Sequence, residues 1–170
     1  MTNFKVGLPP VIREGSTILI VGTLPGDNSI QLGQYYANIS NHFWKILSAV
    51  YGETIENDYL RRLEFLHSKG LALWDVLKSA ERPGSSDSGI ENEVSNDFSA
   101  LLTAFPGLRA IVFNGGEARR LFRRHVKKSR SDAASILLRE VTLPSTSSTP
   151  GTHVLSFEDK VGRWKALRSL

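Results

Sequence analysis

The 170-residue chain contains no cysteine, which excludes disulfides, thiolate metal ligands and cysteine nucleophiles. No apolar run approaches the roughly 20 residues that a membrane-spanning helix needs. Residues 1–16 lack the apolar core of a signal peptide, so we expect a cytoplasmic protein without a membrane partner. The length is that of a single domain, and we expect residues 1–170 to form it.

Several common catalytic signatures are also missing. The four histidines are not spaced as metal ligands and the acidic residues form no evident cluster, so we expect neither a metal nor a cofactor. The segment GTLPGDNS (22–29) lacks the Gly-Lys-Ser/Thr ending of a phosphate-binding loop. VFNGGEA (112–118) is not a dinucleotide fingerprint, and no G-x-S-x-G elbow is present.

What the chain has in excess is positive charge. Its net charge of +4 and pI of about 9.5 favour a polyanionic partner, although an enzyme acting on a neutral small molecule could carry the same charge. Within 116–128, basic residues form two rows at i,i+4 spacing, namely Arg119, Arg123 and Lys127, and Arg120, Arg124 and Lys128. We interpret this helix as a solvated face that attracts DNA in a general way at most.

Short apolar runs alternate with amphipathic segments along the chain. The apolar runs predict strands at 16–22, 71–74, 109–113 and 136–143. The amphipathic segments predict helices at 40–52, 57–70, 95–105, 116–128 and 157–170. Segments rich in Ser, Gly and Pro predict loops at 79–92 and 143–153. Strands separated by helices form a parallel sheet covered on both faces, so we predict an α/β fold with α/β/α layers.

Polar or glycine-rich residues follow each predicted strand. TLPGDNS (23–29) and then QYYANISNHFW (34–44) follow the first, Asp75 the second, Asn114 the third and LPSTSSTPG (143–151) the fourth. Because the carboxyl ends of parallel strands meet at one edge, we predict a binding site there. Each residue alone could equally be a turn former or a helix cap. Together, amides, hydroxyls and tyrosine rings suit the stacking and hydrogen bonding of a nucleobase.

In order and spacing, VGTLPGDNS, QYYANISNHFWKIL, GLALWDVL, VFNGGEA and LPSTSS resemble the hypoxanthine-DNA glycosylase branch of the uracil-DNA glycosylase superfamily. The resemblance runs from about residue 16 to the C-terminus. It implies a three-layer α/β/α fold with a central four-stranded parallel sheet. It also implies a monofunctional glycosylase of base-excision repair. Such an enzyme flips a deaminated base, hypoxanthine foremost, out of double- or single-stranded DNA and hydrolyses its N-glycosidic bond. We expect it to act as a monomer.

The chain also differs from better-known branches of this family. Leu24 replaces the Asp or Asn that positions the attacking water, and Leu143 replaces a histidine near the leaving base. The hypoxanthine branch shares both losses, and an asparagine in its opening segment takes over; Asn41 matches that position. Asn38 stands where the family pattern has a histidine, and Ile-Ser at 39–40 stands where it has Pro-Arg.

Without a strong base, we expect a dissociative reaction that the enzyme promotes by position and electrostatics. We assign Asn41 to orienting the water or the leaving purine and Asn114 to hydrogen-bonding the base; a helix cap is the alternative for Asn41. The predicted base-binding residues are Gly22, Pro25, Gly26, Tyr35, Tyr36, Asn38, Phe43 and Asp75. Core packing is the alternative for the aromatic residues, and helix capping or holding the asparagines for Asp75. The predicted DNA-backbone contacts are Ser145, Thr146 and Ser147.

Three alternatives stay open from the sequence. The main substrate could be uracil or a mispaired thymine within the same superfamily. The missing general base also fits a nucleic-acid-binding domain without catalysis, and the same fold could serve a small-molecule hydrolase. The predicted loop 79–92 is either a DNA-facing loop or a solvated connection.

Overall fold

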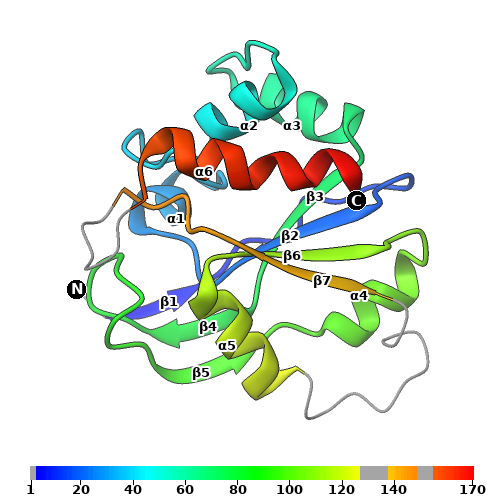
Figure 1. Cartoon of the computed structure of the whole chain (residues 1–170). Coiled ribbons are helices and arrows are strands. Elements are labelled where there is room, and N and C mark those ends of the chain that lie inside the picture. Colours follow the sequence, from blue (N-terminus) through cyan, green and yellow to red (C-terminus); the bar gives the residue numbers. More distant parts are fainter. Residues whose placement is uncertain (1–2, 127–137, 149–154) are drawn as a thin grey trace.

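The computed structural model describes residues 3–126, 138–148 and 155–170 (Figure 1). Its centre is a parallel sheet of four strands in the order β3-β2-β6-β7. These strands are β2 (Ile18–Gly22), β3 (Leu71–Asp75), β6 (Ala110–Asn114) and β7 (Arg139–Leu143). Every residue of β2 and β3 is buried, as expected for strands covered on both faces. The predicted α/β fold with a four-stranded parallel sheet is confirmed.

Alternate residues of β2 point to opposite faces of the sheet and define two cores. Leu19 and Val21 pack with apolar residues of α4 (Phe98–Ala104) and α5 (Gly116–His125). Ile18 and Ile20 face the other way. They pack with residues of α2 (Phe43–Tyr51), α3 (Tyr59–Ser68), α6 (Phe157–Trp164) and the 3-10 helix η3 (Lys165–Ser169). Figure 1 shows these two helical layers above and below the sheet.

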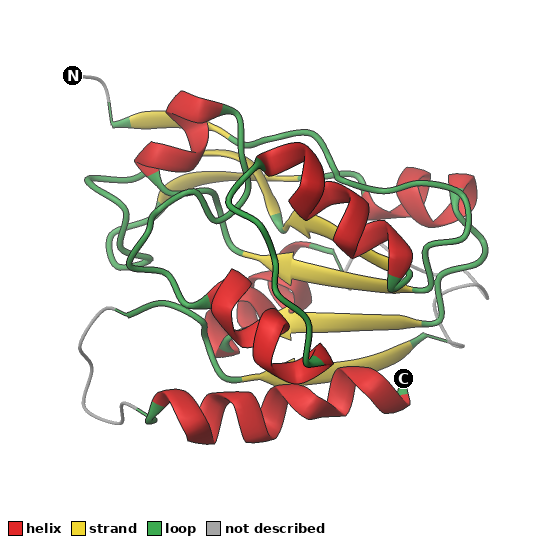
Figure 2. Cartoon of the chain, turned by 90° about the horizontal axis from the view of Figure 1, so that it is seen from above, coloured by secondary structure: helices red, strands yellow, loops and turns green. Residues whose placement is uncertain are grey.

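A second, antiparallel sheet was not predicted. It has the order β1-β4-β5 and consists of β1 (Phe4–Val6), β4 (Leu77–Glu81) and β5 (Glu91–Ser95). Leu77 and Ala80 of β4 are buried while Lys78 and Glu81 are exposed, so this strand covers the core with one side only. In Figure 2, β1 lies on the opposite side of the molecule from the C-terminal helix.

Several predicted boundaries need correction. The segment 79–92 is not all loop, because β4 ends at Glu81 and β5 begins at Glu91. The helix predicted at 95–105 begins only at Phe98, since Ser95 still belongs to β5 and Asp97 caps the helix by accepting from the Ala100 N–H. The short helix α1 (Asp27–Leu32) was not predicted.

Some predictions lie outside the described residues. These are Lys127 and Lys128 of the basic segment, residues 136–137 of the fourth strand, and residues 149–153 of the second loop. In the described part of the chain, no helix has the length and apolarity needed to cross a membrane.

Candidate active site

The carboxyl ends of the parallel strands meet in one row, as predicted. Gly22 of β2 pairs with Asp75 of β3, and Asn114 of β6 pairs with Leu143 of β7. A cavity of about 860 Å³ opens over this row. Binding sites for small molecules commonly have volumes of roughly 300–1,000 Å³, so the cavity can take a nucleobase and its sugar.

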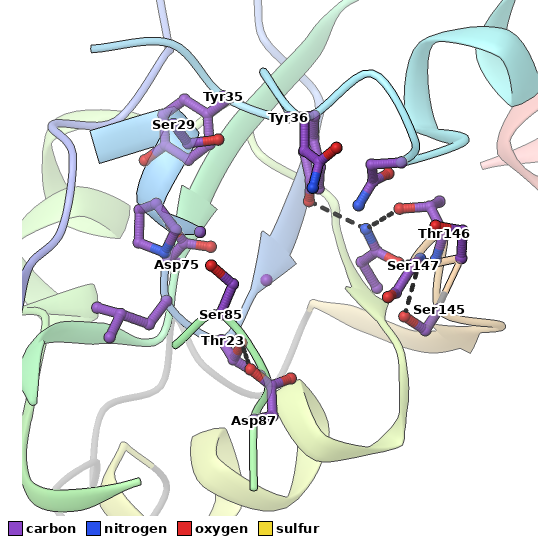
Figure 3. A pocket seen from close by; sticks show the side chains of 18 of the residues that line it. Thr23, Ser29, Tyr35, Tyr36, Asp75, Ser85, Asp87, Ser145, Thr146 and Ser147 are labelled. Atoms are coloured by element: carbon purple, nitrogen blue, oxygen red, sulfur yellow. Dashed lines mark hydrogen bonds between the residues drawn. The ribbon is translucent and has the colours of Figure 1, made fainter. Parts of the chain in front are cut away.

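Twelve of the thirteen predicted site residues line this cavity (Figure 3). They are Gly22, Pro25, Gly26, Tyr35, Tyr36, Asn38, Asn41, Asp75, Asn114, Ser145, Thr146 and Ser147. The exception is Phe43, which is fully buried and does not border the cavity. Its ring stacks on that of Tyr36, with centroids 3.8 Å apart and planes 15° apart. The predicted direct contact between Phe43 and a base is therefore corrected: Phe43 supports the Tyr36 ring from behind.

Asn114 holds two other segments of the site together. Its Nδ2 donates to the Tyr36 hydroxyl at 3.0 Å and to Thr146 Oγ1 at 2.9 Å (Figure 3). Its Oδ1 accepts from the Thr146 N–H at 2.9 Å, which fixes which end of the amide is oxygen. Because both amide hydrogens are already used, Asn114 has no donor left for a base in this arrangement.

Thr146 is the second centre of this network. Its side chain is directed at Asn114, and the residue is only 1% exposed. Its carbonyl accepts from the His42 N–H at 3.0 Å, which ties the loop after β7 to the start of α2. The predicted contact between Thr146 and a DNA phosphate is corrected, because this buried side chain positions Asn114 instead. Ser145 is exposed, and Ser147 is half-buried.

Asn41 bonds to the start of α2 and also borders the cavity. Its Oδ1 accepts from the Phe43 N–H at 2.9 Å, so it satisfies a free amide at the start of α2. Its Nδ2 makes no hydrogen bond to any described residue, and the side chain borders the cavity. The bond to Phe43 therefore orients the amide, while the NH₂ group stays available to a ligand.

The two tyrosines serve different purposes. The Tyr35 hydroxyl donates to the carbonyls of Leu8 and Pro9, at 3.2 and 3.1 Å, so only part of this buried residue borders the cavity. The Tyr36 hydroxyl accepts from Asn114 and keeps its own hydrogen free to donate. Burial and the nearby Asp75 raise the pKa of Tyr36, so its hydroxyl remains a donor at neutral pH. Tyr36 has a left-handed backbone with φ of 53°, which is rare for a bulky residue and places the ring at the cavity.

Asp75 is a buried carboxyl with an unpartnered oxygen. It is 5% exposed and borders the cavity, and its Oδ2 has no hydrogen-bond partner among the described residues. Burial, followed by repulsion from Asp87, raises its pKa to about 7. The alternatives from the sequence do not fit. Asp75 leads into β4 and not into a helix, and its carboxyl contacts no asparagine among the described residues.

Gly22 allows this arrangement by having no side chain. A Cβ atom at Gly22 would lie 2.5 Å from Asp75 Oδ1 and 3.5 Å from the Tyr36 hydroxyl. The first distance is shorter than real Cβ contacts, so any other residue would displace the carboxyl. Asp75 and Tyr36 therefore both lie next to the Gly22 backbone at the cavity.

The wall formed by residues 82–90 was missed. Arg82 is fully buried and donates to the carbonyls of Leu24 and Pro25, at 3.0 and 2.5 Å. Thr23 Oγ1 donates to Asp87 Oδ1 at 2.7 Å (Figure 3). This segment is therefore more than a solvated connection, because it packs on the turn after β2 and lines the cavity with Ser85, Ser86 and Asp87. No local pattern distinguishes Arg82 from a surface arginine.

The fold adds a further carboxyl group, that of Asp87, to the predicted Asp75 at the cavity. Asp75 and Asp87 are separated in the sequence, but both border the cavity, and burial raises the pKa of each. They do not form a metal site: among the described residues no three His, Asp or Glu side chains are grouped closely enough to hold an ion. Lys160 and Arg163 of α6 also line the cavity and were likewise not predicted.

The chain belongs to the uracil DNA glycosylase superfamily, whose family model matches residues 9–168. The predicted resemblance is confirmed. Two curated relatives carry the more specific name hypoxanthine DNA glycosylase. One, from Methanosarcina barkeri, is 45% identical over 112 residues, which cover 65% of this chain and 71% of the relative. The other, from Methanosarcina acetivorans, is 44% identical over 115 residues, covering 67% and 73% respectively.

A solved structure has the same fold. It is the solution structure of a candidate uracil DNA glycosylase from Methanosarcina acetivorans, with a TM-score of 0.76 and 34% identity. The match covers 97% of this chain and 99% of that protein. The similarity therefore extends over the cavity and both helical layers.

Proposed function

We propose that this protein is a monofunctional DNA glycosylase that removes hypoxanthine from DNA. The names of the two Methanosarcina relatives support this activity. The single structural observation that carries the proposal is the grouping of Asn41, Tyr36 and Asp75 around one cavity at the carboxyl edge of the sheet. An enzyme that acts on a base must take it out of the helix, and this cavity provides the space.

The three side chains match the polar groups of a hypoxanthine ring. The ring offers N1–H as a donor, and O6, N3 and N7 as acceptors. The Asn41 amide and the Tyr36 hydroxyl each have a free hydrogen to donate. The Asp75 carboxyl can accept from N1–H through its unpartnered Oδ2. Tyr36, backed by Phe43, supplies an aromatic wall beside the base.

These contacts favour departure of the base. As the bond from the sugar carbon to the purine nitrogen breaks, both electrons leave with the purine. Donors from Asn41 and Tyr36 stabilise the negative charge that develops on the ring, and one such donor elsewhere is worth about 3 kcal/mol. Water then adds to the sugar carbon and releases a proton, and the purine takes up a proton. The reaction is a hydrolysis that needs no cofactor.

Asn114 acts in this proposal as a positioning residue. Its hydrogen bond to the Tyr36 oxygen orients the hydroxyl and makes it a stronger donor. The contact between Asn114 and the base that we expected from the sequence would first require one of its present bonds to break. Asn38, Pro25 and Gly26 complete the walls, and Ser145 and Ser147 remain candidates for the DNA backbone.

A panel of duplex oligonucleotides tests the proposal. The strands carry inosine, uracil, xanthine or a mispaired thymine, and the readouts are free base by chromatography and strand breakage after alkali. We expect release of hypoxanthine to be fastest, and Asn41→Ala to abolish most of it. Asn57→Ala, an exposed asparagine outside the cavity, serves as the matched control.

The other outcomes distinguish the alternatives. Breakage of uracil strands with intact inosine strands would assign a uracil specificity. Binding to every duplex without release of base would leave a non-catalytic DNA-binding domain. Cleavage of free inosine with no action on DNA would indicate a nucleoside hydrolase.

A further inference from the structure

Helix α6 holds the loop after β7 at two points. Lys160 Nζ donates to the Ser147 carbonyl at 2.8 Å, and Trp164 Nε1, one turn later, donates to the Pro144 carbonyl at 2.9 Å. Trp164 is fully buried and anchors the helix in the core. The side of α6 that carries Lys160 is therefore fixed relative to the loop that borders the cavity.

Lys160 is a buried cation with no counter-ion among the described residues. The residue is 6% exposed, yet it lines the cavity. No described carboxylate lies within ion-pair distance of its ammonium group. Burial lowers the pKa of Lys160 and no nearby acid opposes this effect. A buried charge is costly unless it is paired, so this position favours an anion.

Arg163 supplies a second positive charge at the same rim. It lies three residues after Lys160, is exposed and lines the cavity. Its guanidinium makes no hydrogen bond or ion pair with the described residues. The arginines of α5 differ, because none of the four lines the cavity, and Arg120 and Arg124 are already paired with Glu117 and Glu93. Lys160 and Arg163 are thus the cations that line the cavity without a paired carboxylate among the described residues, and the exposed Ser145 lines the same cavity.

We propose that Lys160 and Arg163 bind a backbone phosphate of the DNA strand that carries the damaged nucleotide. This inference rests on the proposed function, since it assigns the phosphate of a nucleotide whose base enters the cavity. The Lys160 ammonium provides a fixed charge, and the planar Arg163 guanidinium can contact two phosphate oxygens. The basic helix that the sequence emphasised, α5, would have the lesser part in binding.

The test measures the affinity for DNA as a function of salt. Fluorescence anisotropy gives Kd for an inosine duplex in a series of KCl concentrations. Each phosphate contact contributes a slope close to one in a plot of log Kd against log salt. We expect Arg163→Gln to raise Kd about tenfold at low salt and to reduce the slope by about one. Arg163→Lys should keep the slope while weakening binding by a smaller factor.

The control is Lys165→Gln, which removes the same charge from an exposed position that does not line the cavity. It should leave Kd within about twofold and the slope unchanged. Lys160→Gln also loosens the loop, so it is compared with Lys160→Arg, which keeps the charge. If Arg163→Gln and the double variant with Lys160→Gln keep the wild-type slope, the inference is wrong.

The anisotropy measurement does not depend on catalysis. If the wild-type protein releases no base, but Arg163→Gln lowers the slope of its DNA binding, the proposed glycosylase is disproved and the phosphate site is retained. If the wild-type protein releases hypoxanthine, but changes at Arg163 and Lys160 leave the slope unchanged, the glycosylase is retained and the phosphate site is disproved.

Discussion

Asn114 makes two hydrogen bonds with Thr146: its Nδ2 donates to Thr146 Oγ1, and its Oδ1 accepts from the Thr146 N–H. The pair connects the end of β6 to the loop after β7, and the remaining amide hydrogen of Asn114 reaches Tyr36. Three segments of the cavity thus depend on one amide. Because the two residues form a unit, the effects of changing them should not add.

Changes at Thr146 test this unit. Thr146→Val removes the acceptor for Asn114 while keeping the shape, and we expect kcat for hypoxanthine release to fall about tenfold. Asn114→Ala should cost about a hundredfold, and the double variant should be little worse than Asn114→Ala alone. Thr146→Ser should stay near wild type. Single-turnover rates at saturating DNA provide the measurement, and strictly multiplicative losses would contradict the coupling.

Asn41→Asp separates capping from catalysis. The carboxylate can still accept from the Phe43 N–H, so the start of α2 is preserved. The donor at the cavity is lost, and we expect a rate reduction of about a hundredfold or more with little change in Tm. Asn41→Ala should lose the same activity and also about 1 kcal/mol of stability. An active Asn41→Asp enzyme would rule out the catalytic role.

Asp75 should make stability depend on pH in an unusual direction. Its pKa rises from an ordinary value of 3.8 to about 7 on folding, so between these values the folded protein holds a proton that the unfolded chain has released. The contribution of this group to the free energy of unfolding therefore falls as the pH rises towards 7. Asp75→Asn should stabilise the protein at pH 8 by up to about 3 kcal/mol, and less at pH 5. Urea unfolding at the two pH values checks this, and an equal effect at both would contradict it.

Arg82 should be essential to the turn after β2. Arg82→Ala leaves the Leu24 and Pro25 carbonyls without their donor and removes a buried charge that faces Asp87. We expect a loss of roughly 3–5 kcal/mol in the free energy of unfolding. Thermal denaturation against Arg61→Ala, an exposed arginine paired only with Glu64 among the described residues, provides the comparison. A Tm shift no larger than that of the control would show that the turn holds without Arg82.

Gly22→Ala should inactivate the enzyme by displacing the Asp75 carboxyl. The added methyl group would lie 2.5 Å from Asp75 Oδ1. We expect the rate to fall at least about a hundredfold, as for misplacement of a reacting group elsewhere. Gly162→Ala, in the middle of α6 with no atom within 4 Å of the added carbon, should retain activity and gain up to about 1 kcal/mol in stability. A fully active Gly22→Ala enzyme would show that the carboxyl can move without consequence.

The part of the fold that the sequence predicts is the part governed by local pattern. Strands β2, β3 and β6 are continuous apolar runs that end at Gly22, Asp75 and Asn114, and a parallel sheet necessarily places those ends together. The position of the strand ends therefore predicts which residues line the cavity. The edge sheet is not predicted because β4 is a short strand of irregular pattern, whose buried residues Leu77 and Ala80 are three apart, and because the following Ser, Gly and Pro residues favour a loop.

The roles of individual side chains were harder to predict because they depend on contacts between distant segments. Asn114 meets Thr146 only through the pairing of β6 with β7, and Arg82 is buried only because the 82–90 segment packs on the turn at Leu24. Composition contains no signal for either. For Phe43 the sequence leaves base contact and core packing open, and the structure shows core packing, with its ring stacked on that of Tyr36.

The bond between the His42 N–H and the Thr146 carbonyl has a bearing on how the protein can be altered. It joins main-chain atoms of segments that are far apart in the sequence, so neither side chain is needed to make it. Residues that line the cavity, such as Asn38 or Ser40, can therefore be varied while this main-chain contact is kept. These positions are therefore suitable for randomisation in a search for variants that act on another damaged base and keep the fold.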